Sequence, residues 1–218
     1  RDRNIDFLGI DFSTSPHSES LCKDIRSPEI EYVIPENTTS LIHLAAVSTD
    51  SDCRHDPTRA YDINITGLQN LITAARKKKV KQFIFSSSEW IYGDSDPQAT
   101  HCEDQAIDLT KILSAYTLSK ACGEQILRTA YQEEAFSVVI FRFSIVYGPR
   151  PSRWSAVEAL LHQVGTQESV MIGSRKTARR FIHVRDICEG LLAAVGRTGF
   201  DIFNLSGDEI ITLGDIID

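Results

Sequence analysis

Short apolar runs alternate with longer amphipathic stretches from the start of the chain to residue 143. The runs are rich in β-branched and aromatic residues and lead into polar or turn residues, a pattern typical of buried strands. They predict strands over residues 5–10, 40–44, 82–86 and 138–143.

Two amphipathic stretches separate these predicted strands. Residues 62–79 and 116–131 repeat apolar positions at the helical period of about 3.6 residues, which predicts helices that each bury one face. Strands that alternate with helices predict an α/β fold, a doubly wound parallel sheet with helices on both faces. Ligands of such sheets bind at the carboxyl ends of the strands, so the residues that follow each strand are the candidates for function.

The pattern changes after Phe143. Glycine and proline interrupt residues 147–151, and we predict a helix over 154–164, a strand over 181–184 and a helix over 187–195 with Asp186 as its N-cap. Thr212 and Asp215 have the spacing of a capping box. Because the chain ends where that helix begins, we expect the protein to continue beyond Asp218.

Composition narrows the classes of function. The formal net charge is -7, which argues against a nucleic-acid partner because phosphate binding needs a basic surface. The five cysteines lack metal-binding spacing, which is typical of a reduced cytoplasmic protein, and we expect no metal. No apolar run approaches the ~20 residues that span a bilayer, so we expect no membrane association.

Chemistry-bearing residues gather in three segments. The helix predicted over 116–131 begins with Tyr116 and Lys120, which share one helix face because they are four residues apart. The strand over 82–86 runs into the sequence SSSEWIYG at 86–93. The segments RFSIVYGP at 142–149 and RRFIHVRD at 179–186 follow further along the chain.

Taken together, these segments resemble the extended short-chain dehydrogenase/reductase family, the nucleotide-sugar epimerases and dehydratases. The sequence LIHLAA at 41–46 is similar to the family's strand-four motif, and NITG at 64–67 is similar to its helix-four asparagine motif. The resemblance covers nearly the whole chain. It implies a Rossmann fold that binds NAD over residues 1–146 and 181–198, and a small substrate-binding region over 147–180 and 199–218.

The resemblance also implies roles for single residues. Tyr116 corresponds to the general acid/base, Lys120 to the ligand of the nicotinamide ribose, and Ser88 to the hydrogen-bond partner of the reacting oxygen, with Ser87 as the near alternative. The remaining implied contacts fall into two sets. The cofactor set, in addition to Tyr116 and Lys120, is Asp11, Asp24, Ile25, Leu44, Ala45, Ala46, Asn64, Ser86, Phe143 and Val146, and the substrate set is Ser48, Ser88, Glu89, Ile145 and Arg179.

Two further expectations concern partners. Asp11 can accept hydrogen bonds from a ribose 2′-hydroxyl and would repel a 2′-phosphate, so we expect NAD rather than NADP. The resemblance implies a homodimer, in which the helices over 62–79 and 116–131 form the interface.

The family's glycine-rich loop is absent from the sequence. Such a loop lies about 20 residues before the acidic ribose residue, whereas ten residues precede Asp11. We therefore expect the first strand, the loop and most of the first helix to lie upstream of Arg1. Backbone N–H groups of that loop normally hold the pyrophosphate, so we expect the 218-residue chain by itself to bind NAD weakly.

Electrostatics can account for a reactive tyrosine. A free tyrosine has a pKa of about 10, and a base near neutrality needs a pKa lower by an amount worth about 3 to 4 kcal/mol. A lysine charge about 4 Å away supplies about 4 kcal/mol at an effective dielectric constant of about 20. Lys120, helped by the positive nicotinamide, is therefore expected to lower the pKa of Tyr116.

Three reactions of this family compete. A 4,6-dehydratase would carry an acidic pair after the catalytic serine or threonine, and here Trp90 follows Glu89, which counts against dehydration. Epimerisation and simple ketone reduction both need only the tyrosine, lysine and serine, and we favour the epimerase. A non-catalytic NAD-binding sensor or scaffold is the alternative from another class, and the intact set of Tyr116, Lys120 and Ser88 argues against it.

The substrate side departs from the family pattern. Ile145 occupies the position of an asparagine that commonly contacts the phosphates of the nucleotide-sugar, and Arg180 replaces the usual aspartate. Arg179 matches the family's phosphate-binding arginine. A nucleotide-sugar is the leading substrate, and a ketone without a nucleotide is the alternative.

Overall fold

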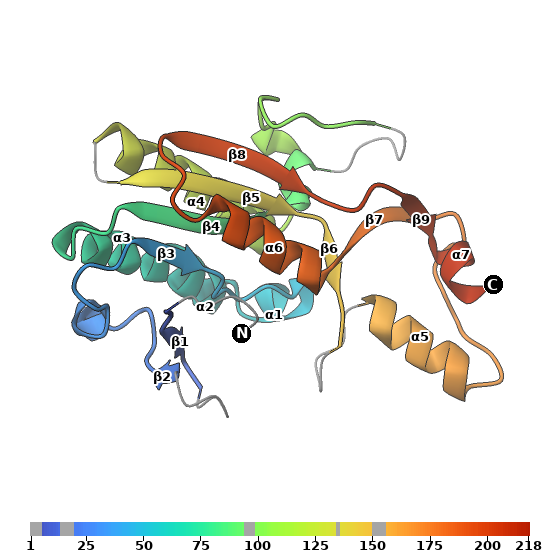
Figure 1. Cartoon of the computed structure of the whole chain (residues 1–218). Helices are drawn as coiled ribbons and strands as arrows, with labels where there is room; N and C mark the ends of the chain where they lie inside the picture. Colours follow the sequence, from blue (N-terminus) through green and yellow to red (C-terminus); the bar gives the residue numbers. More distant parts are fainter. Residues whose placement is uncertain (1–5, 14–19, 94–98, 134–135, 150–155) are drawn as a thin grey trace.

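A parallel four-stranded sheet with helices on both faces forms the centre of the protein (Figure 1). The computed structural model describes residues 6–13, 20–93, 99–133, 136–149 and 156–218. The strands are β1 (Gly9–Asp11), β2 (Ser20–Cys22), β3 (Ser40–His43), β4 (Gln82–Ser88), β5 (Ser137–Phe143), β6 (Ile145–Tyr147), β7 (Ala178–His183), β8 (Phe200–Leu205) and β9 (Ile210–Thr212). The α-helices are α1 (Asp50–His55), α2 (Pro57–Tyr61), α3 (Gly67–Lys77), α4 (Ala115–Gln132), α5 (Ala156–Thr166), α6 (Val184–Ala194) and α7 (Leu213–Ile217).

Four shorter helical segments connect these elements. Three are 3-10 helices, and one is a π-helical turn that leads directly into α3. Their bounds are η1 (Pro28–Tyr32), η2 (Asp62–Thr66, the π-turn), η3 (Glu89–Tyr92) and η4 (Leu109–Lys111).

Strand residues alternate between two hydrophobic cores. The order of the sheet is β3-β4-β5-β8, and all three pairings are parallel. Phe83 and Phe85 of β4 point into the core beneath α3 and α4, whereas Ile84 points into the core beneath α6. Because successive strand side chains face opposite sides of a sheet, a strand covered on both faces is apolar throughout. This confirms the predicted α/β fold.

Two smaller sheets flank the central one. Strands β1 and β2 pair with each other in parallel, and β6, β7 and β9 form a mixed sheet. Strand β7 continues into α6, so the mixed sheet and the central sheet are joined through that helix. Helices α5 and α7 lie together at the end of the molecule beyond this mixed sheet (Figure 1).

Several boundaries differ from the prediction. Asp186 was expected to cap the helix after β7, but α6 begins at Val184 and its N-cap is His183, whose Nδ1 accepts a hydrogen bond from the Arg185 N–H. Asp186 lies in the first turn, where a carboxylate also favours the helix dipole. The capping box of Thr212 and Asp215 is confirmed. Residues 5 and 154, where a strand and a helix were expected to begin, lie outside the described residues.

Candidate active site

Tyr116 and Ser88 meet where β4 ends and α4 begins. Ser114 caps α4 through its hydroxyl, which accepts the Thr117 N–H, and this places Tyr116 in the first turn. The side chains of Tyr116 and Ser88 lie close enough to interact, and this interaction lowers the pKa of the phenol. Both hydroxyls therefore lie at the carboxyl end of the central sheet, where ligands of such sheets bind.

Lys120 lies one turn further along α4 and is buried. Its Nζ donates to the backbone oxygen of Ser86 at 2.7 Å and lies 5.8 Å from the centre of the Tyr116 ring. Burial lowers the pKa of Lys120 to about 8. Gly123 lets the helix approach the sheet this closely, since a Cβ there would come within 2.7 Å of the Phe85 ring.

Tyr116 itself has a high pKa in this arrangement. Burial raises the pKa of Tyr116 to about 12, and the interaction with Ser88 acts in the opposite direction. Lys120 is not among the groups that shift this pKa. The expected lowering of the Tyr116 pKa by Lys120 is therefore not found in this arrangement. The reason is geometric, because Lys120 donates to Ser86 rather than to the phenol.

The three consecutive serines have separate partners. Ser86 Oγ donates to the backbone oxygen of His43 on the neighbouring strand at 3.1 Å. Ser87 Oγ donates to the Glu124 carboxylate at 2.5 Å. Ser88 Oγ accepts the Trp90 N–H at 3.3 Å, and Ser88 is the serine whose side chain interacts with Tyr116. The geometry therefore supports Ser88 over Ser87 as the partner of the tyrosine.

A buried ion pair lies behind the serines. Arg142 of β5 and Glu124 of α4 form two hydrogen bonds, and Arg142 Nη1 also donates to the Tyr92 hydroxyl at 2.7 Å. Glu124 lies four residues beyond Lys120 and shares its helix face. The pair was not predicted from the sequence, although an arginine inside an apolar strand is a signal for a buried counter-ion.

Asn64 connects the loop after β3 to α4. Its side chain accepts the Val47 N–H at 2.8 Å, donates to the Val47 carbonyl at 3.0 Å and donates to Ser119 Oγ at 2.9 Å. Ser119 Oγ in turn donates to the Tyr116 carbonyl oxygen. Asn64 lies in the π-turn η2, and it is buried. Its three described hydrogen bonds therefore join the loop after β3 to the first turns of α4.

Most of the remaining expected cofactor residues lie at or just after the carboxyl ends of β1, β2, β3 and β5, and Val146 lies in β6. Asp11 is exposed at the end of β1, where its carboxylate accepts from the Ser13 N–H and hydroxyl. The Arg26 guanidinium lowers the pKa of Asp24 by hydrogen bonding to it. The apolar members of the expected set differ in exposure: Leu44 and Ala45 are exposed after β3, whereas Ile25, Ala46, Phe143 and Val146 are half-buried.

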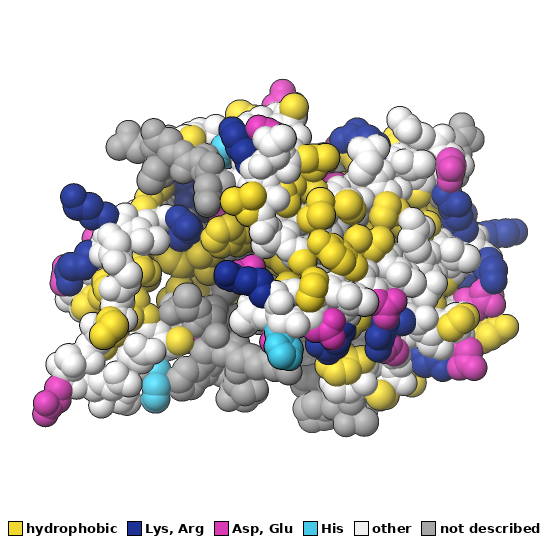
Figure 2. Space-filling view, turned by 180° about the vertical axis from the view of Figure 1, so that it is seen from behind, with side chains coloured by type: hydrophobic (Ala, Val, Ile, Leu, Met, Phe, Trp, Pro, Cys, Tyr) yellow, Lys and Arg dark blue, Asp and Glu magenta, His cyan; other side chains and the backbone are white. Residues whose placement is uncertain are grey.

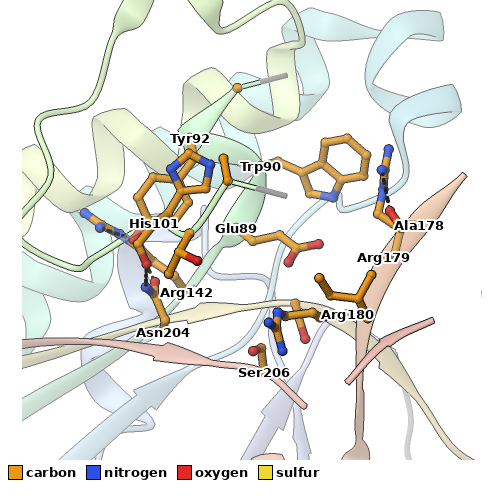
Figure 3. Close-up of a pocket in the computed structure, with 15 residues that line it drawn as sticks. Glu89, Trp90, Tyr92, His101, Arg142, Ala178, Arg179, Arg180, Asn204 and Ser206 are labelled. Atoms are coloured by element: carbon orange, nitrogen blue, oxygen red, sulfur yellow. Dashed lines mark hydrogen bonds between the residues drawn. The ribbon is translucent and has the colours of Figure 1, made fainter. Parts of the chain in front are cut away.

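Two cavities adjoin these residues. One, of about 470 Å³, is lined by Tyr116 and Ser48 together with Trp90, Gly93, Lys111, Leu113, Ser114, Thr117, Asp50 and Arg54. The other, of about 340 Å³, contains Glu89 and Arg179 together with Arg180 (Figure 3). Ile145, half-buried in β6, lines neither cavity.

The second cavity is lined by both acidic and basic side chains. Figure 3 shows Glu89 reaching into it from the turn after β4, with Arg180 on the opposite wall. Burial raises the pKa of Glu89 to about 7, and the charges of Arg179 and Arg180 act in the opposite direction. Ser144 also lines this cavity, and its buried hydroxyl has no hydrogen-bond partner among the described residues. A bound polar group could supply that partner.

The described residues contain no cluster of three or more side chains able to hold a metal ion. Within the same ranges, no helix has both the length and the apolar character needed to cross a membrane.

His43 is buried, and burial together with the Lys120 charge lowers its pKa to about 3, so its ring is neutral.

The fold and this site define a dinucleotide-binding α/β protein with a tyrosine-serine-lysine centre. Residues 5–206 match the profile of the NAD dependent epimerase/dehydratase family, and the chain belongs to that family. NAD is the cofactor of the family, as its name states.

Known relatives carry out more than one reaction. The chain is 28% identical over 182 residues to a UDP-glucuronate 4-epimerase of Thermodesulfobacterium geofontis, covering 83% of this chain and 55% of the relative. It is 27% identical over 146 residues to the dTDP-D-glucose 4,6-dehydratase of Homo sapiens, covering 66% of this chain and 40% of the relative. The chain therefore spans about half the length of the curated relatives it matches.

A solved structure shares the fold. The UDP-glucose 4-epimerase of Thermus thermophilus, in complex with NAD, superposes with a TM-score of 0.78 and 25% sequence identity. The match covers 94% of this chain and 68% of that one.

Proposed function

We propose that this protein is an NAD-dependent enzyme that oxidises and re-reduces a hydroxyl of a nucleotide-sugar, and that the net reaction is epimerisation. The observation that carries the proposal is the proximity of the Tyr116 and Ser88 side chains at the end of β4, with the buried Lys120 on the same helix face as Tyr116. The relatives and the solved neighbour include enzymes named for UDP-sugar epimerisation.

The residues present fit the ribose and nicotinamide parts of NAD. Lys120 takes part in no ion pair among the described residues, and its described hydrogen bonds both go to Ser86, so the ammonium can donate further to ribose hydroxyls. The exposed Ala45 leaves room beside the end of β3 for a flat ring. Asp11 would accept from the adenosine ribose and thereby favour NAD over NADP. NAD, when bound, accepts a hydride from the substrate carbon and returns it.

The chain's own residues move the proton. The Tyr116 oxygen removes the proton of the reacting hydroxyl as the carbonyl forms, and gives it back when the carbonyl is reduced. Ser88 holds the reacting oxygen by hydrogen bonding. The pKa of about 12 for Tyr116 has to fall for this role. Positive charge brought by the cofactor, and reorientation of Lys120 away from Ser86, would both lower it.

The substrate side is the cavity of Arg179, Arg180 and Ser144. Two guanidinium groups suit a diphosphate, since arginine binds phosphate oxygens in pairs. The unpartnered Ser144 hydroxyl offers a further hydrogen bond.

Substitution of Tyr116 by phenylalanine tests the catalytic assignment. Tyr116→Phe removes only the proton-transferring oxygen, so we expect turnover of a nucleotide-sugar to fall by 100-fold or more, on the order of a lost general acid/base, with little change in the Kd for NAD. Product formation by chromatography and NAD binding by calorimetry measure the two effects. Retention of half the activity would show that Tyr116 is not the acid/base.

We also propose that the protein is a homodimer that uses the face of α3 and α4. Figure 2 shows that hydrophobic side chains gather in the middle of this face. Tyr131 of α4 is exposed, and Leu118 and Ala121 are half-buried. Sedimentation at micromolar concentration should give a dimer, and a monomer would contradict this assignment.

A further inference from the structure

Trp90 lies where the two cavities meet. Its side chain lines the cavity that holds Tyr116 and also the cavity that holds Arg179 and Arg180. Of the residues that line the two cavities, only Gly93 shares this position. A ligand that places an anionic group on the arginines and a hydroxyl on Tyr116 therefore has to cross Trp90.

The position of Trp90 is fixed on both sides. Its backbone N–H donates to Ser88 Oγ at 3.3 Å, which ties it to the serine that contacts Tyr116. Its carbonyl accepts the Gly93 N–H at 3.0 Å. The Arg179 guanidinium lies 5.3 Å from the centre of the indole ring, within the range of a cation–π contact (Figure 3).

The indole is nevertheless unusually open for so large an apolar group. Trp90 is 42% exposed, although its neighbours Ile91 and Tyr92 in the same turn are buried. Covering this surface with an apolar ligand face would gain free energy in proportion to the area removed from water. Arg179 lies over the ring, so the remaining exposed surface of the indole is what a ligand can cover.

We propose that Trp90 is a specificity-determining residue on which the pyranose ring of the substrate packs while the ligand spans from Arg179 to Tyr116. The proposal rests on the proposed function and names the part of the ligand that is selected. A pyranose has a face made of C–H groups, and that face can pack on an aromatic ring while its hydroxyls remain free for Tyr116 and Ser88. A nucleoside diphosphate that lacks the pyranose would not make this contact.

Substitution of Trp90 separates the sugar contact from the phosphate contact. Calorimetry on the full-length protein, saturated with NAD, compares UDP-glucose with UDP for the unmodified protein, Trp90→Phe and Trp90→Ala. Trp90→Ala should weaken UDP-glucose by about tenfold or more, the size expected for loss of one aromatic contact, and change the Kd of UDP by less than about twofold. Trp90→Phe should lie between. In turnover the loss should appear in KM rather than in kcat.

Tyr32→Ala is the matched control, because Tyr32 is an exposed aromatic residue that lines neither cavity. It should leave both ligands unaffected. Equal losses for UDP and UDP-glucose in Trp90→Ala would overturn the inference, because the indole would then act by holding Arg179. Unchanged binding in both Trp90 variants would also overturn it. Failure of the unmodified protein to bind any nucleotide-sugar would instead refute the proposed function, and this inference with it.

Discussion

Lys120 is the residue at which burial and charge oppose each other most directly. The residue is 4% exposed, and its ammonium donates to a neutral carbonyl and has a pKa of about 8. Such a group is stabilised less in the folded state than in water, because no carboxylate compensates for the lost hydration. The arrangement is expected of a functional site, where local stability is given up to prepare a ligand contact.

Lys120→Met should make the cofactor-free protein more stable near neutral pH. The interval between an ordinary lysine pKa of 10.5 and about 8 corresponds to roughly 3 kcal/mol of free energy of unfolding. Below pH 8 the folded protein holds the charged lysine and bears this penalty. Between pH 8 and 10.5 the folded state loses the proton before the unfolded state does, so the penalty disappears.

Urea denaturation at several pH values measures this effect. The gain in the methionine variant should be largest below pH 8 and shrink as the pH approaches 10.5. Lys81→Met, at an exposed lysine, is the control and should show no such trend. A methionine variant that is less stable than the unmodified protein at neutral pH would show that the Ser86 contact outweighs the burial of charge.

At the scale of elements, α4 carries the site and Glu124 anchors that helix to the sheet. The carboxylate binds Arg142 of β5 and accepts from Ser87 of β4, so a single side chain joins three elements. Arg142 extends the connection to Tyr92 and to the Glu103 backbone. Ser87 and Ser88 are neighbours, and the ion pair therefore helps to hold the end of β4 against the first half of α4.

Glu124→Gln should be strongly destabilising. The Arg142 side chain is only 3% exposed, and removing the carboxylate charge leaves the guanidinium buried without a counter-ion. Loss of one partner of a buried pair costs about 3 to 5 kcal/mol. Equilibrium denaturation measures this loss.

Glu133→Gln is the matched control, because Glu133 follows the same helix and pairs with Arg76 at the surface. An exposed pair contributes about 0 to 1 kcal/mol, so this change should be nearly neutral. The double variant Glu124→Gln with Arg142→Met should recover part of the loss, since it removes the isolated charge. Equal effects of Glu124→Gln and Glu133→Gln would contradict the anchoring role.

The sequence predicted elements better than it predicted the contacts between them. Short continuous apolar runs at residues 83–85 and 138–141 identified β4 and β5, because the middle of a strand that is covered on both faces is buried. The four-residue spacing placed Tyr116 and Lys120 on one face. The direction in which Lys120 donates depends on a backbone oxygen 34 residues away, which no local pattern encodes.

The expected cap of α6 was wrong for a similar reason. Asp186 is the common type of N-cap residue, yet the helix begins three residues earlier than expected because β7 runs directly into it at Val184. From the sequence, Trp90 was interpreted only as the replacement of the second acidic residue that a 4,6-dehydratase would carry. Its place between two cavities follows from the mixed sheet that carries Arg179, and that sheet pairs residues far apart in the chain.

At the scale of the whole molecule, the two cavities and the central sheet form one path. The sheet positions Tyr116 and Lys120, the mixed sheet supplies the arginines, and the turn after β4 connects the two. This path is suited to a ligand with an anionic end and a reacting hydroxyl. The central claim is that such a ligand is a nucleotide-sugar that is oxidised and reduced again at the same carbon.

Isotope retention tests that claim most directly. The protein is supplied with NAD and with UDP-glucose that carries deuterium on the carbon of the sugar's 4-hydroxyl, and the products are analysed by mass spectrometry and NMR. The account predicts the 4-epimer with the deuterium still on that carbon, because the hydrogen leaves and returns without mixing with water. Tyr116→Phe should give no product. Loss of the label to solvent, or no change in any nucleotide-sugar tested, would contradict the account.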